Sequence, residues 1–125
     1  QEIHGAIRNA DRIILASPIF FFGLSAQAKI MIDRCQPFWY EKYILHRPLQ
    51  GGLHGRKGLL ILVGGMTREI GVQCGGATGT AFFRTISVPE HETISFLGVD
   101  EKGAIRARPD ALAKVFEAGV RLSSP

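Results

Sequence analysis

The stretch RIILASPIFFFGLSAQAKIMIDRCQ, residues 12–36, joins a short apolar segment to an amphipathic one through three consecutive phenylalanines. Arg12–Ala16 is a nearly continuous run of apolar and β-branched side chains. Such a run is typical of a strand buried in a parallel sheet, and Pro18 is expected to end it. The stretch therefore begins with a predicted buried strand.

A helix is predicted to follow the aromatic segment. Ser25 is a candidate N-cap, and apolar residues then recur at helical spacing at Ala28, Met31, Ile32 and Cys35. The pattern predicts a helix that reaches at least Gln36, and Pro37 should kink or end it.

The rest of the chain alternates in the same way. We expect a helix over residues 2–10, a loop over 48–55, a strand over 58–63, a helix within 72–87, a strand over 93–99, a turn over 100–103 and a helix from Pro109. The helix within 72–87 should begin only near Gly76, since each glycine costs about 1 kcal/mol relative to alanine. The expected apolar face of the last helix is Leu112, Val115, Phe116, Gly119 and Leu122. This order predicts an α/β protein with a parallel sheet between helix layers.

Length and composition fit one domain. The chain has 125 residues, 46% of them hydrophobic, and no apolar run approaches the ~20 residues of a membrane span. Gln1–Ala10 lacks the apolar core of a signal peptide. Only two cysteines occur, without a CxxC pair, which favours a reducing, cytoplasmic location. The net charge of +4 is scattered, so we expect neither a nucleic-acid nor a membrane partner.

Parallel sheets bind ligands at the carboxyl ends of their strands. In this chain those ends are Ser17–Ser25 and Gly64–Gly76, and ten of the 15 glycines lie between Gly51 and Gly79. Phe20, Phe21 and Phe22 either pack partly under the sheet edge or form an apolar wall for a flat aromatic ligand. Gly64 and Gly65 either make a tight turn or let main chain lie against that ligand.

Other chemistry-bearing residues form weaker patterns. Four histidines and two cysteines show no metal-ligand spacing: His4, His46, His54, His91, Cys35 and Cys74. Glu90–Glu92 is expected to be an exposed loop before the last strand. The aromatic residues Phe38, Trp39, Tyr40 and Tyr43 are either core or a dimer contact.

Three segments together resemble one family. ADRIILASPIFFFGLSAQAKIMIDRCQ (residues 10–36), RKGLLILVGG (56–65) and GVDEKGAIRARPDAL (98–112) are similar to the NADPH-dependent FMN reductase family of flavodoxin-like proteins. The resemblance implies a doubly wound parallel sheet, of which this chain, as a single domain over residues 1–125, holds the third to fifth strands and their flanking helices.

The same resemblance implies that the chain lacks the family's N-terminal third. The chain does not begin with Met, which also predicts a longer gene product. In the family, the missing third carries the loop that holds the FMN phosphate. We therefore expect that residues 1–125 alone hold FMN weakly, and that the edge of the Arg12–Ala16 strand is bare and pairs with another copy or with preceding residues.

The family's flavin site can be carried over by position. The resemblance places Ser17, Pro18, Ile19, Phe20, Phe21, Phe22 and Gly23 against the flavin ring, and Gly64, Gly65 and Met66 near its other edge. No side-chain acid or base and no metal are expected, because the flavin carries the reaction. The implied activity is an FMN-dependent NAD(P)H oxidoreductase that passes electrons to a quinone, a flavin or a metal ion and forms a homo-oligomer. The alternatives are a flavodoxin-type electron carrier or FMN-binding module without NAD(P)H chemistry, and a flavin-free structural fragment.

Overall fold

The computed structural model describes residues 2–125; Gln1, the first residue of the predicted domain, lies outside the described residues. In chain order the elements are α1 (Glu2–Asn9), β1 (Arg12–Phe20), β2 (Gly23–Leu24), α2 (Ala26–Asp33), α3 (Gln36–Tyr43), β3 (Lys57–Val63), α4 (Ile70–Thr85), β4 (Glu90–Phe96), the 3-10 helix η1 (Ala104–Ala107) and α5 (Pro109–Ser123). Within residues 2–125, no helix has both the length and the apolar character needed to cross a bilayer.

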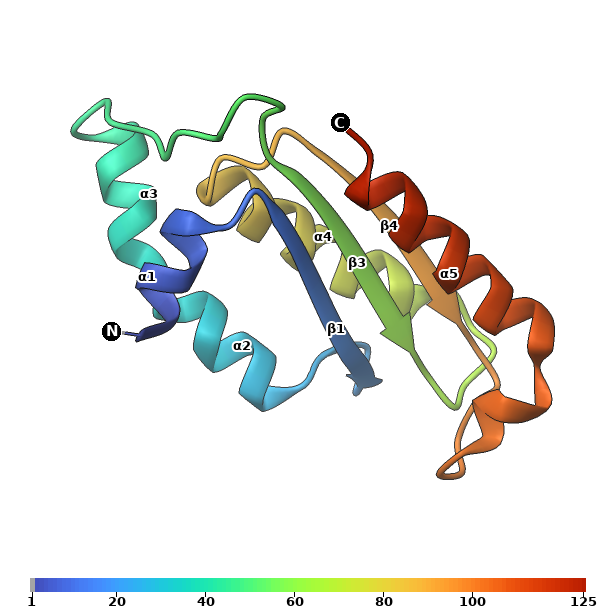
Figure 1. The fold of residues 1–125 in the computed structure, drawn as a ribbon. Helices are drawn as coiled ribbons and strands as arrows, with labels where there is room; N and C mark the ends of the chain where they lie inside the picture. The colour runs from blue at the N-terminus through green and yellow to red at the C-terminus, as the bar shows by residue number, and fades with distance from the viewer. Residues whose placement is uncertain (1) are drawn as a thin grey trace.

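The strands form one sheet in the order β2-β1-β3-β4. β1 pairs with β3 and β3 with β4 in parallel, while β2 adds a short antiparallel hairpin to the end of β1. The register aligns Pro18 of β1 with Val63 of β3, and Val63 with Phe96 of β4. The three carboxyl ends therefore meet at one edge of the sheet, as Figure 1 shows.

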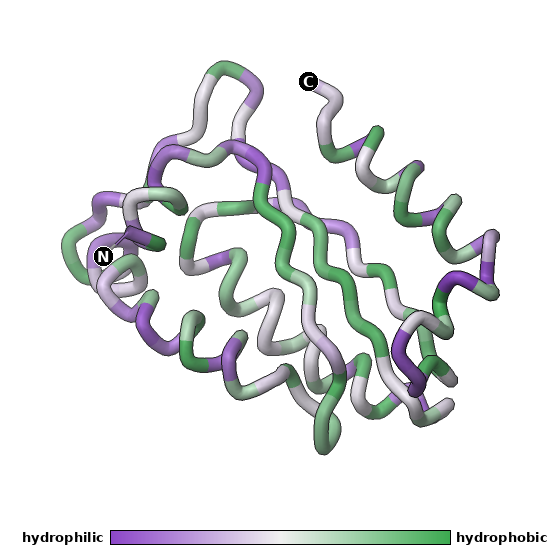
Figure 2. The backbone as a smooth tube through the Cα atoms, turned by 60° about the horizontal axis from the view of Figure 1, so that its bottom comes forward, coloured by the Kyte–Doolittle hydropathy of each residue, from purple (hydrophilic) through white to green (hydrophobic). Residues whose placement is uncertain are grey.

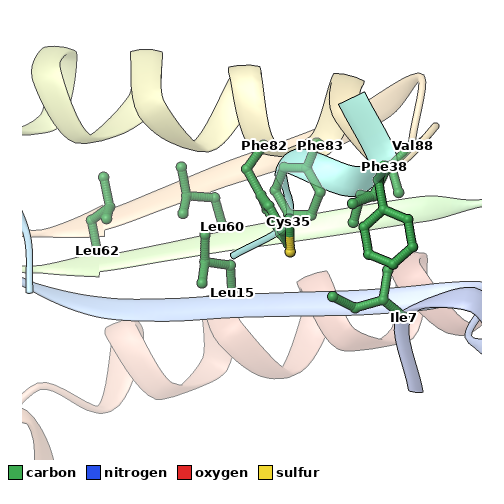
Figure 3. Close-up of a cluster of buried hydrophobic side chains, with 10 residues drawn as sticks. Ile7, Leu15, Cys35, Phe38, Leu60, Leu62, Phe82, Phe83 and Val88 are labelled. Carbon is green, nitrogen blue, oxygen red and sulfur yellow. The ribbon is translucent and has the colours of Figure 1, made fainter. Parts of the chain in front are cut away.

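Helices cover both faces of this sheet, which confirms the α/β prediction. α4 lies on one face and α5 on the other (Figure 1). Hydrophobic runs follow the central strands (Figure 2), and the main core lies between the sheet and α4. That core contains Leu15 and Leu60 from the strands, Phe82 and Phe83 from α4, and Phe38 from α3 (Figure 3).

α4 begins six residues before the predicted start near Gly76. Three of its four glycines, Gly71, Gly75 and Gly79, are buried on the face that packs against the sheet. A Cβ added to Gly79 would lie 2.7 Å from Leu60 Cδ2, and one added to Gly71 would lie 2.6 Å from Ile19 Cγ2. The close approach of helix to sheet outweighs the low helix propensity of glycine, and the predicted boundary was therefore wrong.

The ends of two strands also differ from the prediction. β1 continues through Pro18 to Phe20, because β3 covers only one edge of β1 and proline is tolerated in an edge strand. β4 begins at Glu90 rather than Thr93, so Glu90–Glu92 is strand and not a loop. His91 packs inward there, with its ring centroid 4.7 Å from that of Phe83.

The helix predicted from Ser25 through Gln36 is two helices. Ser25 caps α2 as predicted, because its hydroxyl accepts a hydrogen bond from the Ala28 N–H at 3.3 Å. α2 ends at Asp33, and α3 begins at Gln36 with Pro37 in its first turn. The proline ring would collide with the carbonyl four residues earlier, which belongs to Asp33, so one helix cannot span both segments.

α5 is present as predicted, but only part of its predicted apolar face packs on the sheet. Ala111 and Ala118 are buried, whereas Leu112 and Phe116 of the predicted apolar face are 48% and 74% exposed. Small side chains let α5 lie close to β3 and β4 and turn its larger apolar residues outward. The helix was predicted correctly, and its predicted apolar face is partly buried at Val115 and Leu122 but exposed at Leu112 and Phe116.

Candidate functional site

A pocket of about 1100 Å³ opens at the carboxyl ends of the three parallel strands. Its walls come from the end of β1, the hairpin to β2, the loop after β3, the start of α4 and the segment after β4. The lining residues are Ala16, Ser17, Pro18, Ile19, Phe20, Phe21, Phe22, Ile61, Val63, Gly64, Gly65, Met66, Arg68, Gly71, Leu97, Val99, Asp100, Glu101 and Lys102.

Nine of the ten site residues predicted from the sequence line this pocket; Gly23 does not. Gly23 pairs with Phe20 across the hairpin and so shapes the wall without belonging to it. Sequence reasoning missed the wall that follows β4, which consists of Leu97, Val99, Asp100, Glu101 and Lys102. The signal was present, because this segment follows the carboxyl end of β4, and ligands bind at the carboxyl ends of parallel strands.

The hairpin between β1 and β2 has a strained backbone. Phe21 and Phe22 have φ angles of 49° and 64°, in the left-handed region. A two-residue hairpin turn with positive φ at both positions normally contains Asn-Gly, and each bulky residue there costs about 1–2 kcal/mol. Backbone strain of this kind persists mainly at functional sites, which points to the hairpin as one.

The same hairpin leaves its aromatic side chains bare. Phe20 is 58% exposed, Phe22 is 39% exposed and Phe21 is fully exposed. The alternative in which these residues pack under the sheet edge is therefore wrong for Phe20 and Phe21, while Phe22 is partly covered. Arg68 adds a cation to this wall, with its guanidinium carbon 5.7 Å from the centre of the Phe22 ring. The wall offers flat apolar surface to a ligand.

Ser17 holds the hairpin in place. It is buried, donates a hydrogen bond to the Pro18 carbonyl at 2.8 Å and accepts one from the Ser25 N–H at 2.9 Å. Its hydroxyl is thus engaged with the two ends of the loop and positions the aromatic wall.

The loop after β3 approaches its neighbours closely. Neither Gly64 nor Gly65 has a positive φ, so a left-handed turn does not explain the pair. A Cβ on Gly64 would lie 3.3 Å from Ile19 Cβ, and one on Gly65 would lie 2.9 Å from Asp100 Oδ1. Close approach is therefore the reason for both glycines. The Gly65 and Met66 N–H groups donate no hydrogen bond within residues 2–125, which leaves two backbone donors in the pocket wall.

No histidine or cysteine lines the pocket, and residues 2–125 contain no group of three side chains suited to a metal ion. Cys35 is buried in the core, where burial raises the pKa of its thiol, while Cys74 is exposed on α4. His91 lies in β4, away from the pocket. Burial lowers the pKa of His91, and the positive charge of Arg84 lowers it further.

Three known proteins are similar to this chain. An iron-sulfur flavoprotein of Methanocaldococcus jannaschii is 49% identical over 37 residues, which are 30% of this chain and 19% of that protein. The NAD(P)H:quinone oxidoreductase from Methanothermobacter marburgensis superposes with a TM-score of 0.72 at 17% identity, over 99% of this chain and 62% of that one. An FMN-dependent NADH-azoreductase from Bacillus anthracis, solved in complex with FMN, gives a TM-score of 0.68 at 17% identity, over 98% and 61%.

The superpositions show a shared fold, and this chain spans about a fifth of the length of the iron-sulfur flavoprotein. The family model for the flavodoxin-like fold matches residues 1–120, nearly the whole sequence. With its parallel sheet, its two helix layers and its pocket at the carboxyl ends of the strands, the chain belongs to the family of proteins with the flavodoxin-like fold.

Proposed function

We propose that this chain forms the ring-binding part of an FMN-dependent NAD(P)H oxidoreductase that passes electrons to a small acceptor such as a quinone, a flavin or a metal ion. The observation that carries the proposal is the strained hairpin, which holds a fully exposed Phe21 at the rim of an apolar pocket. A protein gains nothing in stability from a bare aromatic residue in a strained turn, so a ligand-binding role accounts for both features.

The residues fit the isoalloxazine ring of FMN. Phe20, Phe21 and Phe22 present apolar surface for a flat ring, and the loop after β3 adds Gly65 and Met66, whose N–H groups make no hydrogen bond within residues 2–125. The pyrimidine edge of the ring carries carbonyl oxygens that accept such hydrogen bonds. Aromatic walls with a few polar groups are typical of cofactor sites.

The protein's part in the reaction is to bind and to shield. Bound FMN would supply the redox chemistry, since flavins accept a hydride and pass electrons on. Ser17 fixes the hairpin through its two hydrogen bonds, and Phe20–Phe22 exclude water from the ring. The charged side chains of the pocket balance, because Arg68 and Lys102 bring positive charge and Asp100 and Glu101 bring negative charge.

Pocket size favours an enzyme over an electron carrier. A carrier needs room for one ring, whereas an NAD(P)H oxidoreductase must also admit a nicotinamide or an acceptor. A volume of about 1100 Å³ lies just above the usual range of roughly 300–1,000 Å³ for small-molecule sites. The names of the similar proteins, a quinone oxidoreductase and an azoreductase, support the same class.

We do not propose an iron-sulfur cluster for this segment, although the first relative is named an iron-sulfur flavoprotein. An iron-sulfur cluster is usually held by four cysteine thiolates. The described residues offer Cys35, which is buried and whose Sγ lies 3.4 Å from the Met31 carbonyl oxygen, and Cys74, which is exposed on another helix. Both are free thiols, which supports a reducing, cytoplasmic compartment.

We also propose that the protein forms a homo-oligomer through α3. Trp39, Tyr40 and Tyr43 are each about half exposed, at 43%, 52% and 45%, while Phe38 of the same helix is buried. Trp and Tyr are enriched at protein interfaces. The predicted dimer contact therefore stays with these three residues, and Phe38 belongs to the core.

Two spectra of the full protein test the proposal. Purified protein reconstituted with FMN should show flavin absorbance after gel filtration, and anaerobic NADPH should bleach that absorbance. Binding without bleaching by NADPH or NADH would point to the electron carrier, and a protein that retains no flavin would contradict both forms.

A further inference from the structure

One carboxylate in the pocket lies directly on the backbone of the loop after β3. A Cβ built on Gly65 would lie 2.9 Å from Asp100 Oδ1 and 3.1 Å from Asp100 Cγ. The Asp100 carboxylate therefore occupies the space that a side chain at position 65 would take. Both residues line the pocket.

Backbone hydrogen bonds hold Asp100 in this place. The Val99 N–H donates to the Gly64 carbonyl at 3.0 Å, and the Gly98 N–H donates to the Met66 carbonyl at 3.4 Å. Gly98 has a φ of 72°, a left-handed conformation that turns the chain after β4 toward the loop after β3. The backbone of the fold therefore fixes the position of Asp100.

Asp100 is also unpaired within the described chain. Between residues 2 and 125 its carboxylate makes no hydrogen bond and no ion pair, although Arg68 and Lys102 line the same pocket. An ionised carboxylate can only accept hydrogen bonds. It lies against Gly65, and the N–H groups of Gly65 and Met66 can only donate hydrogen bonds.

We propose that Asp100 determines which ring the pocket accepts, by taking a hydrogen bond from an N–H on the edge of a planar ligand. Together with the Gly65 and Met66 donors, Asp100 complements an imide edge, in which one N–H lies between two carbonyl groups. The pyrimidine edge of isoalloxazine has this pattern, with its N–H at N3. The inference rests on the proposed function and adds a specificity residue to it.

The size of the effect follows from the charge of the acceptor. Hydrogen bonds to charged groups contribute enough to change affinity by roughly 10- to 100-fold. Because Asp100 is exposed to solvent, we expect the lower end of this range of affinity changes. We expect Asp100 to favour FMN over an analogue blocked at N3 by about tenfold.

The test compares FMN with 3-methyl-FMN, in which a methyl group replaces the N3 hydrogen. Dissociation constants are measured by quenching of flavin fluorescence for the full wild-type protein, Asp100→Ala, Gly65→Ala and a control, Asp33→Ala. Asp33 is a surface carboxylate on α2 whose only partner among residues 2–125 is Lys29, and it lies outside the pocket. Circular dichroism verifies that each variant is folded.

The wild type and Asp33→Ala should bind FMN about tenfold more tightly than 3-methyl-FMN. Asp100→Ala should bind both flavins within about a factor of two, and Gly65→Ala should do the same because its Cβ displaces the carboxylate. A preference that persists in Asp100→Ala, or that is missing in the wild type, overturns the role of Asp100 and leaves the proposed function intact. A wild-type protein that binds neither flavin overturns both the proposed function and the role of Asp100.

Discussion

The two faces of the sheet differ in how completely they are covered. On the α4 face, Leu60, Leu62 and Phe83 are fully buried. On the α5 face, Leu59 is buried beneath the helix, but Ile14 of β1 is 56% exposed and Phe116 of α5 is 74% exposed. Figure 1 shows why: α5 lies over β3 and β4, and no described helix lies over that side of β1.

The difference shows where the fold gets its stability. α4 approaches the sheet closely because glycine lines its inner face, so strand and helix side chains interlock in one dense layer. α5 packs through Ala111 and Ala118, which bury little apolar surface of their own. We therefore expect stability to depend mainly on the α4 face, and the α5 face to tolerate change or to bind something further.

The largest expected effect is a cavity in the α4 layer. Leu60→Ala should lower the free energy of unfolding by about 2–5 kcal/mol, the range for leucine removed from a packed core. Leu112→Ala, on the exposed side of α5, should change it by less than about 0.5 kcal/mol. Urea unfolding followed by circular dichroism measures both, and similar losses would show that the two faces do not differ.

The glycines of α4 give the next largest effect. Gly79→Ala should destabilise by about 1–3 kcal/mol, because its Cβ would lie 2.7 Å from Leu60 Cδ2. Gly76→Ala, in the same helix, meets no atom within 4 Å and should stabilise by about 0.5–1 kcal/mol. If both substitutions stabilise the protein in urea unfolding, the close approach of α4 does not require glycine.

A smaller effect on stability is expected when the pH is lowered, through His91 on the α4 face of the sheet. Since burial beside Phe83 lowers the pKa of His91 from 6.5, the unfolded chain binds a proton more readily than the folded one. Neutral His91 makes its full contribution to the free energy of unfolding above the pKa that it has in the unfolded chain. This contribution is lost as the pH falls from 6.5 toward the pKa of His91 in the folded protein. The midpoint of urea unfolding should therefore fall less across this range in His91→Phe than in the wild type. An equal fall in both would contradict this assignment.

The smallest expected effect lies on the open face. Phe116→Ser should change the free energy of unfolding by less than about 0.5 kcal/mol if that face is bare in solution. Chemical denaturation at two protein concentrations provides the measurement. A loss of more than about 2 kcal/mol would mean that another copy, or residues outside the described part, covers Phe116.

The edge of β1 belongs to the same comparison. β2 pairs with only Ile19 and Phe20, so the rest of that edge is bare among the described residues. We expect this edge to pair with another copy or with preceding residues, and this stays a prediction. β4, at the other edge, begins with Glu90 and Glu92, whose charges discourage pairing.

Local patterns predicted most elements, and tertiary contacts decided the rest. Apolar runs located β1 and β3, and helical spacing located α2 and α5, because burial of one face follows from sequence periodicity. The start of α4 was misplaced because local propensity says nothing about a helix that lies close to a sheet.

The candidate site divides in the same way. The hairpin and the Gly64–Met66 loop were predicted from an unusual aromatic run and a glycine pair. Asp100 lies in the segment 98–112 that resembles the family, but its place in the pocket was not predicted, because it depends on the hydrogen bonds from Val99 to Gly64 and from Gly98 to Met66. The left-handed backbone at Phe21 could not be predicted either, because local preference disfavours it.

The most direct test of the flavin site is the dissociation constant of FMN for Phe21→Ala in the full protein, with Phe116→Ala as the control. Both side chains are exposed, so neither substitution should unfold the protein, and only Phe21 lines the pocket. We predict that Phe21→Ala weakens FMN binding by about 1–3 kcal/mol, roughly 5- to 150-fold, and that Phe116→Ala leaves it unchanged. An unchanged dissociation constant in Phe21→Ala would contradict the proposal that the hairpin holds the flavin ring.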